Sequence, residues 1–180
     1  GRQYSVFTDY LEDKNYWGLS SLLRTGDYFN VQMCYHDIPE HLNPFDYETF
    51  DKNPSKGYAV VTNIETGLAE YLPMKNMHRN IDAVRASASM PLVSRPVEIN
   101  GKLYLDGGLA DSIPLLHAVT DGCRKNVVVM TKEAGYRRVQ PKHLELIKAR
   151  YAKYPKVYEL MANRAAAYNP VSYTHLRAHE

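Results

Sequence analysis

Short apolar runs bounded by turn residues occur four times between residues 58 and 105, and a fifth run spans 126–131. The first four predict strands at 58–62, 68–72, 96–99 and 102–105. The continuous apolar run at 126–131 is typical of a strand covered on both faces. Asn100 and Gly101 separate two of the runs and predict a tight hairpin, because both turn positions need a positive φ.

Helix signals precede and follow the hairpin. Pro91 disfavours the α conformation at Met90, so a helix ending near residues 85–89 is expected to give way to an extended loop there. Asp111 suits the cap of a second helix that runs roughly to residue 121, with Gly122 at its C-terminal cap.

Two further segments have apolar residues at helical spacing. The first contains Tyr16, Trp17, Leu19, Leu22 and Leu23, and the second contains Leu144, Ile147, Tyr151, Tyr154, Val157, Leu160 and Met161. The first stripe fits core packing against the sheet, which we favour, or a cap that contacts acyl chains or a membrane. The second segment also has a basic face, which fits either a solvated surface, again favoured, or contact with anionic lipid.

Composition and charge limit the possible partners. Of the 180 residues 44% are hydrophobic, enough for one core, and the formal net charge is +2. No basic run is dense enough to indicate nucleic acid, and no stretch reaches the roughly 18 apolar residues of a membrane span. We expect no nucleic-acid partner, a cytoplasmic location with at most peripheral membrane contact, and two buried free thiols at Cys34 and Cys123.

The most informative polar signal is Asp106, which ends a short apolar strand and is followed by Gly107 and Gly108. Sites in α/β folds gather at such strand ends. Glycines let the backbone approach a partner closely because they have no Cβ. Taken alone, the three residues fit an ordinary strand-ending turn equally well.

Other polar residues are weaker candidates. His36 and His41 are not expected to bind a metal, because Pro39 between them argues against a shared helical face. Ser87 and Ser89 are expected to cap a helix or line the pocket. His117 is expected at the surface or the edge of the core, since its spacing from Asp106 does not suit a Ser-His-Asp triad. We predict neither a metal nor a cofactor.

The order of these signals resembles the patatin-like phospholipase family, and a bacterial branch of it most closely. The matching stretches are 59–67 (AVVTNIETG), 85–91 (RASASMP), 106–108 (DGG), 111–114 (DSIP), 126–129 (NVVV), 24–27 (RTGD) and 43–47 (NPFDY). The resemblance covers about residues 1–169. It implies an α/β fold, a three-layer patatin-like sandwich with a central, mainly parallel sheet flanked by helices.

The resemblance also implies a serine acyl hydrolase that uses a Ser-Asp dyad without histidine and cleaves carboxylic esters of phospholipids or lysophospholipids. Asp106 matches the dyad aspartate, which would act as general base, and Gly107 and Gly108 support the motif. In the family the serine lies in a Gly-x-Ser-x-Gly turn, and a glycine-rich loop binds the oxyanion. This sequence contains neither of these motifs, so the nucleophile serine is not in this chain.

We therefore expect an incomplete sandwich that lacks the nucleophile region. Residues 1–169 are interpreted as the C-terminal part of a patatin-like acyl hydrolase domain with the start of a helical C-terminal extension. Residues 170–180 resemble a translated sequencing-adapter tail and are expected to be non-native. The chain alone is expected to be inactive. The alternative is a non-catalytic lipid- or protein-binding module with the same fold, although such a module has no need of a carboxylate at position 106.

Overall fold

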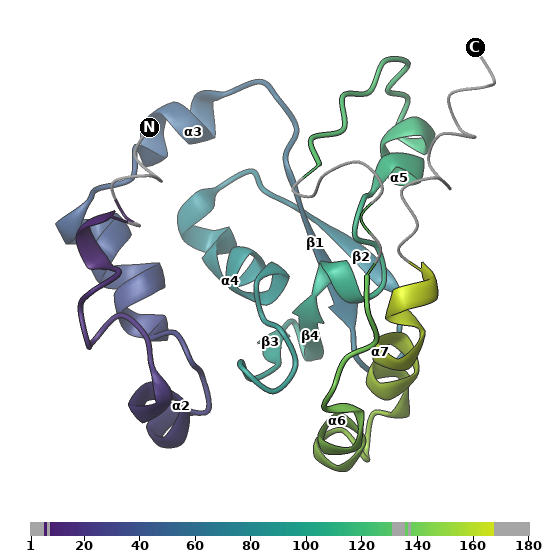
Figure 1. The fold of residues 1–180 in the computed structure, drawn as a ribbon. Helices are drawn as coiled ribbons and strands as arrows, with labels where there is room; N and C mark the ends of the chain where they lie inside the picture. The colour runs from purple at the N-terminus through teal and green to yellow at the C-terminus, as the bar shows by residue number, and fades with distance from the viewer. Residues whose placement is uncertain (1–5, 7, 131–135, 137, 168–180) are drawn as a thin grey trace.

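A computed structural model describes residues 6, 8–130, 136 and 138–167 and contains one four-stranded sheet (Figure 1). Its strands are β1 (Tyr58–Asn63), β2 (Ala69–Pro73), β3 (Val97–Ile99) and β4 (Lys102–Asp106), in the order β2-β1-β4-β3. The helices are α2 (Leu19–Thr25), η1 (Met33–Leu42), α3 (Tyr47–Lys52), α4 (Met77–Ser87), η2 (Gly107–Leu109), α5 (Leu115–Thr120), α6 (Leu144–Arg150) and α7 (Pro155–Ala167).

Helices cover both faces of this sheet, so the predicted three-layer arrangement is present. On one face Val61 and Tyr104 pack with Ala86 of α4. On the other face Leu105 packs in a second cluster with α6 and α7 (Figure 1). All strand pairings among the described residues are antiparallel. The α/β class is therefore confirmed, but the described part of the sheet is antiparallel where a mainly parallel one was expected.

Two hairpins form in the sheet, one of them at the predicted turn of Asn100 and Gly101. β1 pairs with β2 across residues 64–68, where Asn63 Oδ1 accepts hydrogen bonds from two backbone N–H groups of the turn. β3 pairs with β4 across Asn100 and Gly101, whose φ angles of 52° and 76° are the positive values that the turn requires. Local turn chemistry therefore fixes the register of the sheet.

The apolar stripe of residues 144–161 packs into the core. Ile147, Tyr151, Val157 and Met161 are buried in one cluster with Leu105. The apolar stripe therefore packs in the core and its basic residues are exposed, while contact of this basic face with anionic lipid stays untested. Among the described residues, no helix is long and apolar enough to cross a membrane.

The N-terminal stripe differs from its prediction. In α2 the buried residue is Ser21, whereas the side chains of Leu19 and Leu23 are 65% and 81% exposed. Core packing against the sheet is therefore wrong for these leucines, because α2 lies at the edge of the molecule beyond α4 (Figure 1). The helix η1 also continues through Pro39, which the sequence was expected to exclude; it does so as a π-helix.

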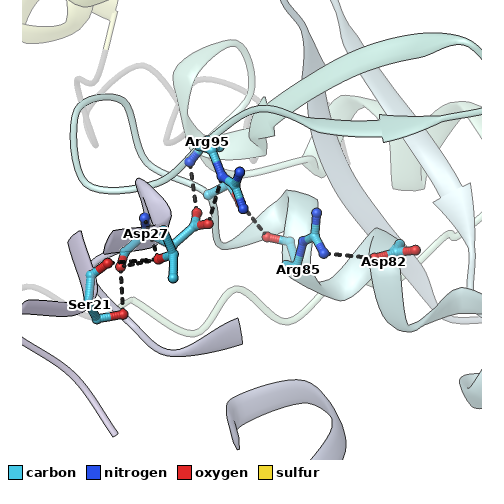
Figure 2. Close-up of polar contacts among 7 residues, drawn as sticks. Ser21, Asp27, Asp82, Arg85 and Arg95 are labelled. Carbon is cyan, nitrogen blue, oxygen red and sulfur yellow. Dashed lines mark hydrogen bonds and ion pairs between the residues drawn. The ribbon is translucent and has the colours of Figure 1, made fainter. Parts of the chain in front are cut away.

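Asp27 anchors this N-terminal region to the loop before β3. Its carboxylate accepts hydrogen bonds from Arg95 N at 2.8 Å and Arg95 Nε at 3.0 Å, and Ser21 Oγ donates to its carbonyl oxygen at 2.9 Å (Figure 2). Gly26 adopts a φ of 81°, and a Cβ there would lie 2.9 Å from Arg95 Cδ. The stretch 24–27 thus makes a structural contact with the loop before β3.

The helix after Asp106 begins later than predicted. Residues 107–109 form the short helix η2, and α5 starts only at residue 115. Asp111 does not cap α5; its carboxylate accepts hydrogen bonds from Ile113 N and from Tyr71 Oη. The close packing of Gly107 on β1 holds the chain in η2, and this contact has no signature in local helix propensity. Gly122 does end α5, with a φ of 93°.

Residues 126–130 do not form the predicted strand. The Val127 and Val129 side chains are 91% and 86% exposed, and no strand of the described sheet pairs with this segment. Apolar sequence alone cannot hold an extended segment whose N–H and C=O groups have no partner strand. Residue 131 of that prediction, and the whole predicted tail 170–180, lie outside the described residues.

Candidate active site

Asp106 lies at the end of β4, where two other parts of the chain hold its backbone. Its N–H donates to Ser89 O at 2.8 Å, just beyond the end of α4. Its carbonyl oxygen accepts from Thr62 Oγ1 at 2.8 Å, and Thr62 is fully buried in β1. The backbone of Asp106 is therefore fixed by the sheet on one side and by the loop after α4 on the other.

Gly107 allows this strand end to lie against β1. A Cβ on Gly107 would lie 2.2 Å from Val60 O and 2.5 Å from Val60 C, which are backbone atoms that cannot move aside. Any larger residue would push β4 and β1 apart at this point. The requirement for glycine is therefore one of space, as predicted from the motif.

Gly108 holds the carboxylate. Its N–H donates to Asp106 Oδ1 at 2.6 Å, and a Cβ on Gly108 would lie 2.9 Å from the same oxygen. No described residue donates a hydrogen bond to the other oxygen, Oδ2. Among the described residues, one carboxylate oxygen is thus held by a hydrogen bond and the other accepts none.

Burial and the neighbouring polar groups shift the pKa of Asp106 in opposite directions. Burial raises the pKa of Asp106, since it disfavours the charged form; the Gly108 N–H and the charges of Arg164 and Arg138 lower it, and the net shift is upward. A carboxylate with a raised pKa is a stronger base than an ordinary surface aspartate. A carboxylate in these surroundings therefore suits a role in which it takes up and returns a proton.

Sequence reasoning did not assign a role to Thr62, Ser89 O, Arg138 or Arg164. Thr62 and Ser89 fall inside stretches that resemble the family, and a buried threonine beside the aspartate strand was a usable signal. A backbone carbonyl leaves no signal in sequence. Arg164 belongs to α7, far along the chain, and only the packing of that helix on the sheet brings it here.

The remaining candidates lie away from the Asp106 carboxylate. Ser89 Oγ donates to Arg85 O at 2.8 Å, so its side chain ends α4 as expected. His117 sits at the edge of the core, with its ring stacked 3.7 Å from that of Tyr71, beside a cavity of about 490 Å³ between the sheet and α5. Asp106 does not line this cavity.

The cysteines and histidines give no second centre in the described part of the chain. Cys34 is half-buried and burial raises the pKa of its thiol to about 11, whereas Cys123 is exposed, so the expected burial of Cys123 is wrong. Both thiols are free, as predicted. Within the ranges that the structure describes, no group of three or more His, Cys, Asp or Glu side chains could hold a metal ion.

Comparison with known proteins agrees with the resemblance. The family model described as patatin-like phospholipase matches residues 3–119, more than half of the chain, and this match includes Asp106, Gly107 and Gly108. An uncharacterized protein of Escherichia coli (strain K12), YjjU, is 39% identical over 62 residues. That match covers 34% of this chain and 17% of the length of the E. coli protein.

Proposed function

Because this chain belongs to the patatin-like phospholipase family, we propose that it contributes the aspartate of a Ser-Asp dyad to a lipid acyl hydrolase. The substrates are carboxylic esters of phospholipids or lysophospholipids. The observation that supports the proposal most strongly is the asymmetric carboxylate of Asp106, with Oδ1 fixed by Gly108 N–H and Oδ2 without a described donor. An aspartate that served only the turn would have no reason to keep one oxygen open in a half-buried place.

The chemistry follows from this geometry. Asp106 accepts the proton of the serine hydroxyl as the serine oxygen bonds to the ester carbonyl carbon. Collapse of the tetrahedral intermediate breaks the bond to the alcohol oxygen, and Asp106 returns the proton to that alcohol. Water then attacks the acyl-serine, again losing its proton to Asp106, and the fatty acid leaves while the proton returns to serine.

In this proposal the serine and the oxyanion donors come from a segment that is not in the given sequence, which contains no Gly-x-Ser-x-Gly. The chain alone therefore does not hydrolyse esters. Each missing oxyanion donor is worth about 3–4 kcal/mol of transition-state stabilisation, so a neighbouring serine within this chain would not restore the activity.

Peripheral contact with a lipid surface is part of the proposal. Leu19 and Leu23 are largely exposed on α2, and Trp17 beside them is partly exposed. Aromatic and aliphatic side chains of this kind partition into the interfacial region of a bilayer. Sedimentation of the chain with vesicles, and loss of that binding in a Leu19→Ser, Leu23→Ser variant, is the expected result; unchanged sedimentation of the variant would contradict this contact.

The activity is tested on a protein that joins this chain to its natural upstream coding sequence. We expect turnover of p-nitrophenyl butyrate, lowered about 10²- to 10⁴-fold by Asp106→Asn. Asp82→Asn is the matched control, because Asp82 is a surface carboxylate that pairs with Arg85. Equal activity of the Asp106→Asn variant and the parent would overturn the proposed dyad.

A further inference from the structure

The loop that joins α4 to β3 supports the backbone of Asp106. Its first polar contact is Ser89 O, which accepts the hydrogen bond from Asp106 N at 2.8 Å. A closed turn follows directly, because Ser94 N donates to Met90 O at 3.0 Å. Ser89 and Arg95 therefore stand at the two ends of one turn, and a displacement of Arg95 is passed on to the residue that holds Asp106.

This turn has a strained backbone. Leu92 within it adopts a φ of 71°, a left-handed conformation that a leucine disfavours. A residue in such a conformation persists only where the surrounding structure holds it. The side chain of Leu92 packs against the core cluster that contains Leu105 and Tyr151. The core thus holds one side of the turn, and the contacts at its other end also determine its shape.

Asp27 makes the contact at the other end, and it binds main-chain atoms there. Its carboxylate accepts hydrogen bonds from Arg95 N at 2.8 Å and from Arg95 Nε at 3.0 Å (Figure 2). The next residue, Tyr28, donates its N–H to Val93 O at 2.8 Å. The side chain of Asp27 is only 9% exposed, so water competes little for its hydrogen bonds. Two main-chain groups at this end of the loop are therefore fixed by consecutive residues.

We propose that Asp27 is a positioning residue for Asp106 and acts through the turn between Ser89 and Arg95. This inference rests on the proposed function, in which Asp106 is the base. Asp27 fixes the backbone of Arg95, and the turn carries this constraint to Ser89. Ser89 O in turn fixes the strand end that carries the Asp106 carboxylate, so Asp27 determines where the proton acceptor lies.

An aspartate that only anchored the N-terminal region would explain less of this geometry. Such an anchor needs only an ion pair with the side chain of Arg95, which is 58% exposed, and an exposed pair contributes little in water. The bond to Arg95 N instead fixes the main chain of the loop. Gly26 permits this close approach, since a Cβ there would lie 2.9 Å from Arg95 Cδ. The contact therefore acts on the loop backbone as well as on a surface side chain.

Amide hydrogen exchange of the 180-residue chain, followed by NMR, tests the proposal without any catalysis. The Asp106 N–H reports on its bond to the loop. The Ile64 N–H, which donates to Leu103 O at 3.1 Å near the other end of β4, is the internal reference. In the Asp27→Ala variant we expect exchange at Asp106 to become about tenfold faster relative to Ile64. Asp27→Asn keeps an acceptor for Arg95 N and should have a smaller effect.

The matched control is Asp82→Asn, because Asp82 pairs with Arg85 on the surface of α4 (Figure 2) and its loss should leave the exchange unchanged. Three results would overturn the proposal. They are unchanged exchange at Asp106 in the Asp27→Ala variant, equal acceleration at Asp106 and Ile64, which indicates a purely structural anchor, and the same local acceleration in the Asp82→Asn variant. Should Asp27→Ala fail to fold, Asp27→Asn is compared with Asp82→Asn by the same criteria.

Turnover in the longer protein separates this inference from the proposed function. Asp27→Asn should lower kcat about three- to tenfold and leave KM close to that of the parent, since a misplaced base slows proton transfer and not substrate binding. An unchanged kcat would overturn the positioning role. Exchange at Asp106 that depends on Asp27, together with turnover that survives Asp106→Asn, would keep the coupling of the two residues and reject the dyad. The reverse result would keep the dyad and reject the role of Asp27.

Discussion

β1 and the segment 126–130 each contain consecutive valines, but the valines of β1 lie in a paired strand and those of 126–130 do not. Val61 of β1 is fully buried, and its strand pairs with β2 on one side and β4 on the other. Val127 and Val129 are almost fully exposed and have no partner strand in the described sheet. An apolar run thus becomes a strand only where neighbours satisfy its backbone, and Asp106 lies in the satisfied region.

Truncating one apolar side chain in each region should give the largest difference in the free energy of unfolding. Leu105 is fully buried between the sheet and α7, so Leu105→Ala is expected to lower the free energy of unfolding by about 2–5 kcal/mol. Val129→Ala removes atoms that already contact solvent and should change it by less than about 0.5 kcal/mol. Urea titration followed by circular dichroism measures both; similar losses would mean that residues 126–130 are buried in solution.

Adding a Cβ at the place where β4 contacts β1 tests the packing of the site itself. Gly107→Ala places a Cβ against Val60 O, and we expect a loss of about 1–3 kcal/mol or more. Gly57→Ala is the control, because its new Cβ would meet only Met74 Cβ at an ordinary 3.5 Å. A Gly107→Ala variant as stable as the Gly57→Ala variant would show that the two strands do not approach this closely.

The Thr62 hydroxyl connects β1 to the Asp106 turn, and its removal should have a smaller effect. Thr62→Val keeps the shape but removes the donor to Asp106 O and the acceptor for Ala110 N. We expect a loss of about 1–2 kcal/mol in a thermal unfolding series. Thr120→Val, at an exposed position on α5, should be close to neutral; a larger loss there than at Thr62 would count against the bond to Asp106.

The sequence was sufficient to predict the features that depend on local signals. The hairpin at Asn100, the end of α4 before Pro91, and the place of Asp106 at the end of a strand followed from turn chemistry and short apolar runs. It was insufficient to predict the features that depend on contacts between residues far apart in the chain. No local pattern shows which elements pack together. The contacts between distant elements decide the exposure of Leu23, the absence of a strand at 126–130 and the position of Arg164 near Gly108.

The smallest effect is expected in the pH dependence of stability. Because burial raises the pKa of Asp106, the folded state holds this proton more tightly than the unfolded chain does. The contribution of Asp106 is therefore fully favourable below its ordinary pKa of about 3.9 and is lost as the pH rises through the folded value. Asp106→Asn should melt slightly above the parent at pH 7 and at the same temperature near pH 3; a lower melting temperature at pH 7 would reverse the sign.

The central claim is that the fold prepares Asp106 as a proton acceptor, and a direct titration of its side chain tests it. The carboxyl ¹³C shift of Asp106 can be followed by NMR between pH 2 and pH 8 in this chain, with Asp106→Asn used to assign the signal. We predict a midpoint above the value of about 3.9 that an unperturbed aspartate shows. A midpoint at or below that value would mean that the nearby arginines outweigh burial, and Asp106 would then be a structural carboxylate and not a base.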